Sequence, residues 1–282
     1  MSDKDTMTDS EKMREYFKNF IDVYVTTADK ANLPADKEKL KEIMDTAEFQ
    51  TFENHSTTGT FSVNRKLIRA IINNFKSNGV KRNNFLLFHE FTHLISPVNE
   101  ELFADQNAFL QKLEEKAKTS PYPYVDEYNA YYGMIAIDEV LAQWCCEEHN
   151  DAYNQKKRKT TESLKGPLDA NVKYTTSFSD NDIYSPLEQP VETLIKKLGY
   201  ENLRDFATQI LSQEYTSLVD RLDEKQFATL CQIGVICKGI YKENGFNNTI
   251  TTTKEDVEKV YALINRNNDF GENPGSGDEP TR

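Results

Sequence analysis

Two histidines four residues apart, His89 and His93, have a spacing that can do chemistry. On an α-helix, residues i and i+4 lie on the same face, so both imidazoles can point at one metal ion. Glu90 lies about 100° further around such a helix, where its carboxylate can act as a general base on water without binding the metal. The pattern H-E-x-x-H at this position predicts a zinc-binding helix.

The stretch that carries this motif is apolar nearly all round, which predicts a buried helix. Asn83 or Asn84 can cap its start, and Pro97 forces an end near Ser96, so the helix should have about three turns. The alternative to a metal site is a pair of core histidines satisfied by hydrogen bonds. Catalytic zinc keeps three protein ligands and leaves one position for water, so a third ligand is expected elsewhere in the chain.

Glu139 is the predicted third ligand. It lies in the segment 135–143, whose apolar residues predict a helix buried beside the core, where a carboxylate without a partner is costly. The other candidates are His55, His149, Glu100, Glu101 and Asp105. Both of these histidines are expected at the surface. The three carboxylates are expected in the solvated first turn of the helix after the motif, where acidic residues suit the helix dipole.

If a zinc-bound water attacks a carbonyl group, as in peptide hydrolysis, an oxyanion forms on the carbonyl oxygen. The site then also needs a group that stabilises this oxyanion. Tyr132 lies seven residues before Glu139, which is two helical turns and nearly the same helix face. Gly133 favours a position for Tyr132 at the entry to this helix. Tyr128 and Tyr131 are the substitutes, and Tyr132 could also be one of several packing tyrosines.

These pieces together carry a resemblance to a known family. The matching residues are His89-Glu90-Phe91-Thr92-His93, Tyr132-Gly133 and Glu139-Val140-Leu141-Ala142. The order and spacing resemble the catalytic domain of anthrax lethal factor and the related Pro-Pro endopeptidases, which are gluzincin zinc metallopeptidases. The resemblance covers about residues 84–145, and Thr92 stands where the relatives often have glycine.

The resemblance implies a set of roles for the motif residues. The implied ligands of one catalytic Zn²⁺ are His89, His93 and Glu139, with Glu90 as general base and Tyr132 as oxyanion partner. The predicted function is a zinc-dependent endopeptidase that acts on a peptide or protein substrate. The alternative is a catalytically inactive zincin-like protein that serves as a protein-binding, toxin or regulatory component. Glu90 separates the two, because a pure binding module has no need of that carboxylate.

Helical spacing dominates the rest of the 282 residues. The predicted helices cover residues 11–25, 36–45, 64–77, 84–96, 99–118 and 134–154, with four more segments between 191 and 265. A Thr-rich, weakly alternating stretch predicts a strand near residues 57–63, which could be the cleft edge that takes an extended peptide. The expected fold is therefore α+β and predominantly helical, with a small twisted sheet, and the resemblance implies that it is zincin-like.

One domain is expected to carry the site and its support. Its predicted parts are a metal-site part at 11–155 and a C-terminal helical lobe at 190–268, within a single domain spanning 11–268, with disordered ends at 1–10 and 269–282. The segment 156–190 predicts mostly polar loop.

Charge and composition exclude several classes of function. The net charge of −12 argues against a nucleic-acid surface, and no run approaches the roughly 18 apolar residues of a membrane span. The polar start has no signal-peptide core, so the expected location is the cytoplasm, with export by a non-classical route or delivery as an effector as the alternative. The cysteines expected as buried free thiols are Cys145, Cys146, Cys231 and Cys237. The oligomeric state is not decided by these features.

Overall fold

A computed structural model describes residues 7–53, 61–63, 65–78, 80–162, 183–212 and 215–269. In the first part of the chain the elements are α1 (Asp9–Ala31), α2 (Lys37–Thr46), β1 (Glu48–Phe52), β2 (Phe61–Val63), β3 (Leu67–Ile71), α3 (Ile72–Ser77), α4 (Val80–Ile95), α5 (Pro97–Phe103), α6 (Gln106–Ala117) and α7 (Glu127–Glu162). After the gap they are α8 (Ser185–Lys197), α9 (Leu203–Leu211), α10 (Leu218–Arg221), α11 (Glu224–Glu243) and α12 (Lys254–Asp269). The expected α+β, predominantly helical class is confirmed for these residues.

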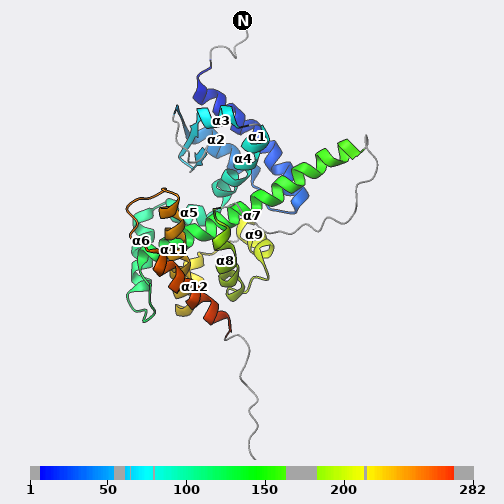
Figure 1. The fold of residues 1–282 in the computed structure, drawn as a ribbon. Helices are drawn as coiled ribbons and strands as arrows, with labels where there is room; N and C mark the ends of the chain where they lie inside the picture. Colours follow the sequence, from blue (N-terminus) through cyan, green and yellow to red (C-terminus); the bar gives the residue numbers. More distant parts are fainter. Residues whose placement is uncertain are drawn as a thin grey trace, which may run out of the picture.

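The long helix α7 organises the arrangement of the other elements. The sheet and α1 to α4 lie on one side of it, while α5, α6 and the helices after residue 183 lie on the other (Figure 1). Helix α11 packs along α7 more extensively than any other described element, followed by α4. A side chain on α7 can therefore meet residues from α4 on one flank and from α11 on the other.

The sheet has the strand order β1-β3-β2, with β1 parallel and β2 antiparallel to β3. Strand β2 confirms the last residues of the strand predicted near 57–63, and the remainder of that prediction lies outside the described residues. The prediction of a helix over 64–77 was wrong for its first half. The apolar run there fits a helical period, but Leu67–Ile71 pairs with strands on both sides, and a doubly paired strand satisfies its backbone without helical bonds.

The motif helix α4 is longer than predicted, because it begins at Val80. Asn83 and Asn84 are thus inside the helix, where Asn83 donates to the carbonyl of Phe75. The end of the helix is as predicted, because Ser96 follows it. The side chain of Ser96 accepts a hydrogen bond from the backbone of Asn99 and so caps the start of α5. The motif therefore lies near the C-terminal end of a long helix, just before a capped turn.

Several other boundaries differ from the predictions. The segment expected as one helix over 99–118 is two helices, because Asp105 caps a new start by accepting from the backbone of Ala108. Helix α7 begins at Glu127 instead of near Met134, and it runs on to Glu162 in the segment 156–190 that predicted loop. Residues 163–182 of that segment lie outside the described part. The four cysteines are buried free thiols, as expected.

His149 is buried, so the prediction of a surface histidine was wrong. Its ring is 1% exposed and stacks between Tyr24, at 4.2 Å between ring centroids, and Phe88, at 5.1 Å. Its Nδ1 lies 2.7 Å from the hydroxyl of Thr27. The charged neighbours of His149 suggested solvent, but α1 and α4 cover the face of α7 on which it lies. Burial lowers the pKa of His149 to about 3.

This buried imidazole predicts a loss of stability in acid. The unfolded chain takes up a proton near the ordinary pKa of 6.5, whereas the folded state resists protonation down to about 3. The contribution of His149 to the free energy of unfolding is fully present above the pKa of the unfolded state. Below that pKa it falls by about 1.4 kcal/mol per pH unit. Between about pH 7.5 and about pH 4.5, His149 should remove about 2.7 kcal/mol from the free energy of unfolding. Urea denaturation at both pH values measures this loss.

A His149→Phe variant is the control for other titrating groups. The phenyl ring keeps the stacking, and Thr27 keeps its hydrogen bonds to the carbonyls of Val23 and Tyr24. The variant should lose less stability than the wild type over the same pH interval, by the amount assigned to His149. Equal losses in both proteins would show that His149 is not protonated on unfolding in this range.

Candidate metal centre

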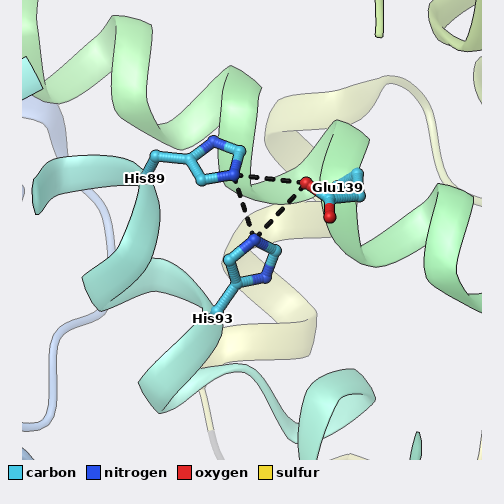
Figure 2. A group of neighbouring side chains, drawn as sticks. All are labelled: His89, His93 and Glu139. Atoms are coloured by element: carbon cyan, nitrogen blue, oxygen red, sulfur yellow. Dashed lines mark hydrogen bonds and ion pairs between the residues drawn. The ribbon is translucent and has the colours of Figure 1, made fainter. Parts of the chain in front are cut away.

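Three predicted ligands from two helices converge on one point. His89 and His93 project from α4 and Glu139 projects from α7 (Figure 2). The two Nε2 atoms are 3.0 Å apart, and Oε2 of Glu139 lies 3.2 Å from Nε2 of His89 and 3.5 Å from Nε2 of His93. In the part of the chain that the structure describes, this group could hold a metal ion.

The geometry and chemistry of this triangle fit zinc. A tetrahedral zinc ion with bonds of about 2.0–2.1 Å separates its ligand atoms by about 3.3–3.4 Å. The distances of 3.0, 3.2 and 3.5 Å bracket that value. Oε2 of Glu139 is buried and makes no well-directed hydrogen bond within the described chain. A buried carboxylate oxygen aimed at two imidazole nitrogens is costly unless a cation lies between them.

Asp138 orients one of the imidazoles, and the sequence analysis missed it. Its carboxylate is 3% exposed and accepts from Nδ1 of His93 at 2.7 Å, from Ser96 at 2.7 Å and from the side-chain amide of Asn99 at 2.8 Å. A hydrogen on Nδ1 leaves the lone pair of Nε2 for a metal. The available signal was a second buried carboxylate directly before Glu139 in the same apolar helix. The turn at Pro97 thus supports the site by supplying two of the donors.

The charges around the ligands are balanced for a cation. Burial alone lowers the pKa of His93, but the carboxylates of Asp138 and Glu139 more than offset this and raise it well above its usual value. Burial alone raises the pKa of Glu139, but the imidazoles of His93 and His89 lower it below its usual range. The raised pKa of His93 and the lowered pKa of Glu139 both mean that the site favours a positive charge next to the ionised carboxylate of Glu139. A divalent cation would supply that charge.

Glu90 lies beside the ligands but is not one of them. Its side chain is partly buried and makes no hydrogen bond with any residue that the structure describes. Burial raises its pKa, although the neighbouring imidazoles of His89 and His93 oppose the shift. A carboxylate with a raised pKa and unused hydrogen-bonding capacity is a better proton acceptor than an ordinary surface glutamate.

Tyr132 lies on α7 two turns before Glu139, as its spacing predicts. Its hydroxyl accepts from the side-chain amide of Asn247 at 3.1 Å, and its ring meets that of Tyr241 edge to face at 5.7 Å. The hydroxyl makes no hydrogen bond with the three ligand side chains. Of the two substitutes, Tyr131 is buried with its hydroxyl bonded to Gln106, and Tyr128 is 57% exposed.

Two further tyrosines border the site and were not found from the sequence. The hydroxyl of Tyr241, on α11, donates to Oε1 of Glu139 at 3.3 Å. Tyr184, just before α8, stacks on the ring of His89 with centroids 6.3 Å apart and planes 9° from parallel, and its hydroxyl is hydrogen-bonded to Tyr241. Burial raises the pKa of both phenols well above the usual range, so both keep their protons. No local pattern links them to the motif, which lies about 90 residues before Tyr184 and about 150 residues before Tyr241 along the chain.

The remaining candidates for the third ligand have other roles. Glu100 is exposed and paired with Arg65, and Asp105 caps α6. Glu101 was expected in solvent, but its side chain is only 14% exposed, because Tyr215 and Ser217 bond to it. His149 is in the core, and His55 lies outside the described residues.

No described helix combines the length and the apolar character needed to cross a bilayer. Searches of protein-family models, of curated proteins and of solved structures find no match to this chain.

Proposed function

We propose that this protein is a zinc-dependent endopeptidase of the gluzincin type, with a zincin-like fold that resembles the lethal factor and Pro-Pro endopeptidase catalytic domains. The observation that carries the proposal is the convergence of His89, His93 and Glu139 at ligand-to-ligand distances of 3.0–3.5 Å. Glu90, which makes no hydrogen bond with the described residues, lies next to them. A site that only bound metal would not need this fourth group.

Each residue has a task in peptide hydrolysis. A bound zinc ion would polarise the scissile carbonyl. It would also lower the pKa of water, so that water gives up a proton more easily and becomes a stronger nucleophile. Glu90 takes the proton of the attacking water and passes it to the leaving amine. Asp138 holds His93 in the tautomer that presents Nε2 to the ion. The hydroxyl of Tyr132 accepts from Asn247, so its own hydrogen is available to the oxyanion.

Strand β2 provides a means of holding an extended peptide. It is one of the two edge strands of the described sheet, it pairs with β3 on one side, and it packs against the motif helix α4. A peptide added to this edge would be held by main-chain hydrogen bonds beside the motif helix. This arrangement supports a peptide or protein substrate over a small molecule.

Removing Glu139 tests the metal centre directly. A Glu139→Ala variant should lose the zinc that the wild-type protein holds at about one ion per chain, since it removes one of three protein ligands. The loss of affinity should exceed the 10–100-fold typical of residues that only support a ligand. Elemental analysis after dialysis against zinc measures the content. Peptide hydrolysis should stop with a chelator and return with added zinc.

Glu101→Ala is the matched control, because the Glu101 side chain is 14% exposed, close to the 15% of Glu139, and among the described residues it bonds to Tyr215, Ser217 and Lys112. It should keep full zinc content. A wild-type protein that takes up no zinc would overturn the proposed function. Full occupancy in Glu139→Ala would remove Glu139 from the ligand set.

A further inference from the structure

Glu139 is contacted on both of its carboxylate oxygens, by different parts of the chain. Oε2 faces His89 and His93, whereas Oε1 accepts a hydrogen bond from Tyr241 at 3.3 Å. Tyr184 is bonded to Tyr241 in turn. We propose that Tyr241, backed by Tyr184, is a positioning residue that fixes Glu139 for metal binding through one oxygen. The inference rests on the proposed function, because it concerns the same metal centre.

A glutamate ligand needs such a constraint. Its side chain has three rotatable bonds, and ordering it costs rotamer freedom. A hydrogen bond to Oε1 limits rotation of the carboxylate and keeps Oε2 directed at the two imidazoles. It also occupies the oxygen that would otherwise compete for the same ion. Tyr241 therefore favours binding through a single oxygen, which three-ligand zinc sites with an open position use.

The two hydroxyls form a connected group with the ligand. Tyr241 donates its hydrogen to Glu139. Tyr241 is also hydrogen-bonded to Tyr184, so both phenols are linked to the carboxylate. The ring of Tyr184 lies parallel to that of His89, with the ring centroids 6.3 Å apart. The pair thus contacts one ligand on α7 and lies beside one on α4.

The helix that carries Tyr241 is placed for this contact by its close packing on α7. Gly234 is seven residues before Tyr241, so both lie on nearly the same face of α11. A side chain at Gly234 would meet the backbone oxygen of Asn129 at 1.8 Å. Only a bare backbone lets α11 lie this close to the helix of Glu139. The C-terminal helices are therefore part of the metal centre, a role that the sequence did not assign to them.

Packing alone is the competing explanation for Tyr241. Its ring contacts Tyr132 at 5.7 Å and Phe246 at 5.4 Å, both edge to face. Phenylalanine at this position keeps these ring contacts and removes only the hydroxyl. A packing role predicts unchanged zinc affinity for Tyr241→Phe, whereas a positioning role predicts weaker binding in a protein of unchanged fold.

The test is the zinc affinity of the full chain, measured by competition with a chromogenic chelator. Tyr241→Phe should bind zinc about tenfold more weakly, at the low end of the range for supporting residues because the bond is long. Tyr184→Phe should fall between this variant and the wild type. Tyr261→Phe is the matched control, since its hydroxyl donates to the carbonyl of Pro186 and not to a ligand side chain, and it should bind like the wild type.

The outcomes separate this inference from the proposed function. Wild-type affinity in both Tyr241→Phe and Tyr184→Phe overturns the positioning role and leaves the zinc site standing. Absence of zinc binding by the wild type overturns the site itself. Thermal unfolding of the metal-free proteins shows whether each variant is folded. If Tyr241→Phe is unfolded, Tyr184→Phe decides alone: weaker zinc binding supports the chain of hydroxyls, and unchanged binding overturns it.

Discussion

Glu90→Gln should keep its zinc and lose peptide hydrolysis, with kcat lowered by about 10²–10⁴-fold. Glutamine has nearly the same shape as glutamate but cannot take a proton at neutral pH. Glu90 has no hydrogen bond with the described residues that the change would break, and removing a charge with a raised pKa relieves a burial cost. Zinc content, thermal stability and turnover of a protein or peptide mixture are measured on the same preparation.

Glu100→Gln is the control for the loss of a carboxylate, because Glu100 lies in α5, the helix directly after the motif helix. Glu100 is exposed at the start of α5 and pairs with Arg65, so its replacement should leave turnover unchanged. Equal turnover of Glu90→Gln and the wild type would remove Glu90 as general base. A wild-type protein that holds zinc but hydrolyses no peptide would favour the inactive zincin-like alternative.

The three side chains that could hold a metal ion could be predicted because the information is local. A helix has a fixed period, so His89 and His93 share a face wherever the helix lies in the fold. Glu139 could be found because a carboxylate in an apolar helix requires a partner. Tyr241 and Tyr184 could not be found in this way. Their contacts depend on how α8 and α11 pack against α7, and no spacing near the motif encodes that packing.

The same distinction explains the errors in the fold. The run through Leu67 and Ile71 fits both a helix and a buried strand, and the partners β1 and β2 decide between them. His149 has charged neighbours, which indicated solvent. In a helix of 36 residues, however, the face that is covered depends on α1 and α4, which are distant in sequence. Gly133 resembles a helix start, but its lack of a side chain serves the contact with α11.

The close contact between α7 and α11 determines the second large expected effect, a loss of stability when a glycine in it is replaced. A side chain at Gly133 would meet the backbone oxygen of Leu230 at 2.2 Å, and one at Gly234 would meet the backbone of Asn129 at 1.8 Å. Backbone atoms inside two helices cannot move aside singly. A methyl group at either position must push α7 and α11 apart along their whole contact, which is the most extensive between described elements.

Gly234→Ala should therefore lower the free energy of unfolding by at least about 3 kcal/mol. This loss would appear despite the roughly 0.5–1 kcal/mol that alanine gains over glycine inside a helix. Gly239→Ala, in the same helix, is the matched control. Its added carbon meets a side-chain methyl of Val257 at 2.7 Å and no backbone atom, so the loss of stability should be smaller than that of Gly234→Ala. Urea denaturation of both variants gives the comparison.

Zinc affinity adds a second measurement to the same pair of variants. Displacing α11 also moves Tyr241 from Glu139, so Gly234→Ala should bind zinc more weakly than Gly239→Ala wherever both are folded. Equal stability of the two variants would contradict the close approach of the helices. A destabilised Gly234→Ala with wild-type zinc affinity would instead mean that α11 supports the fold but not the ligands. Because the stability of the helix pair and the affinity of the site are measured separately, the two roles of α11 can be told apart.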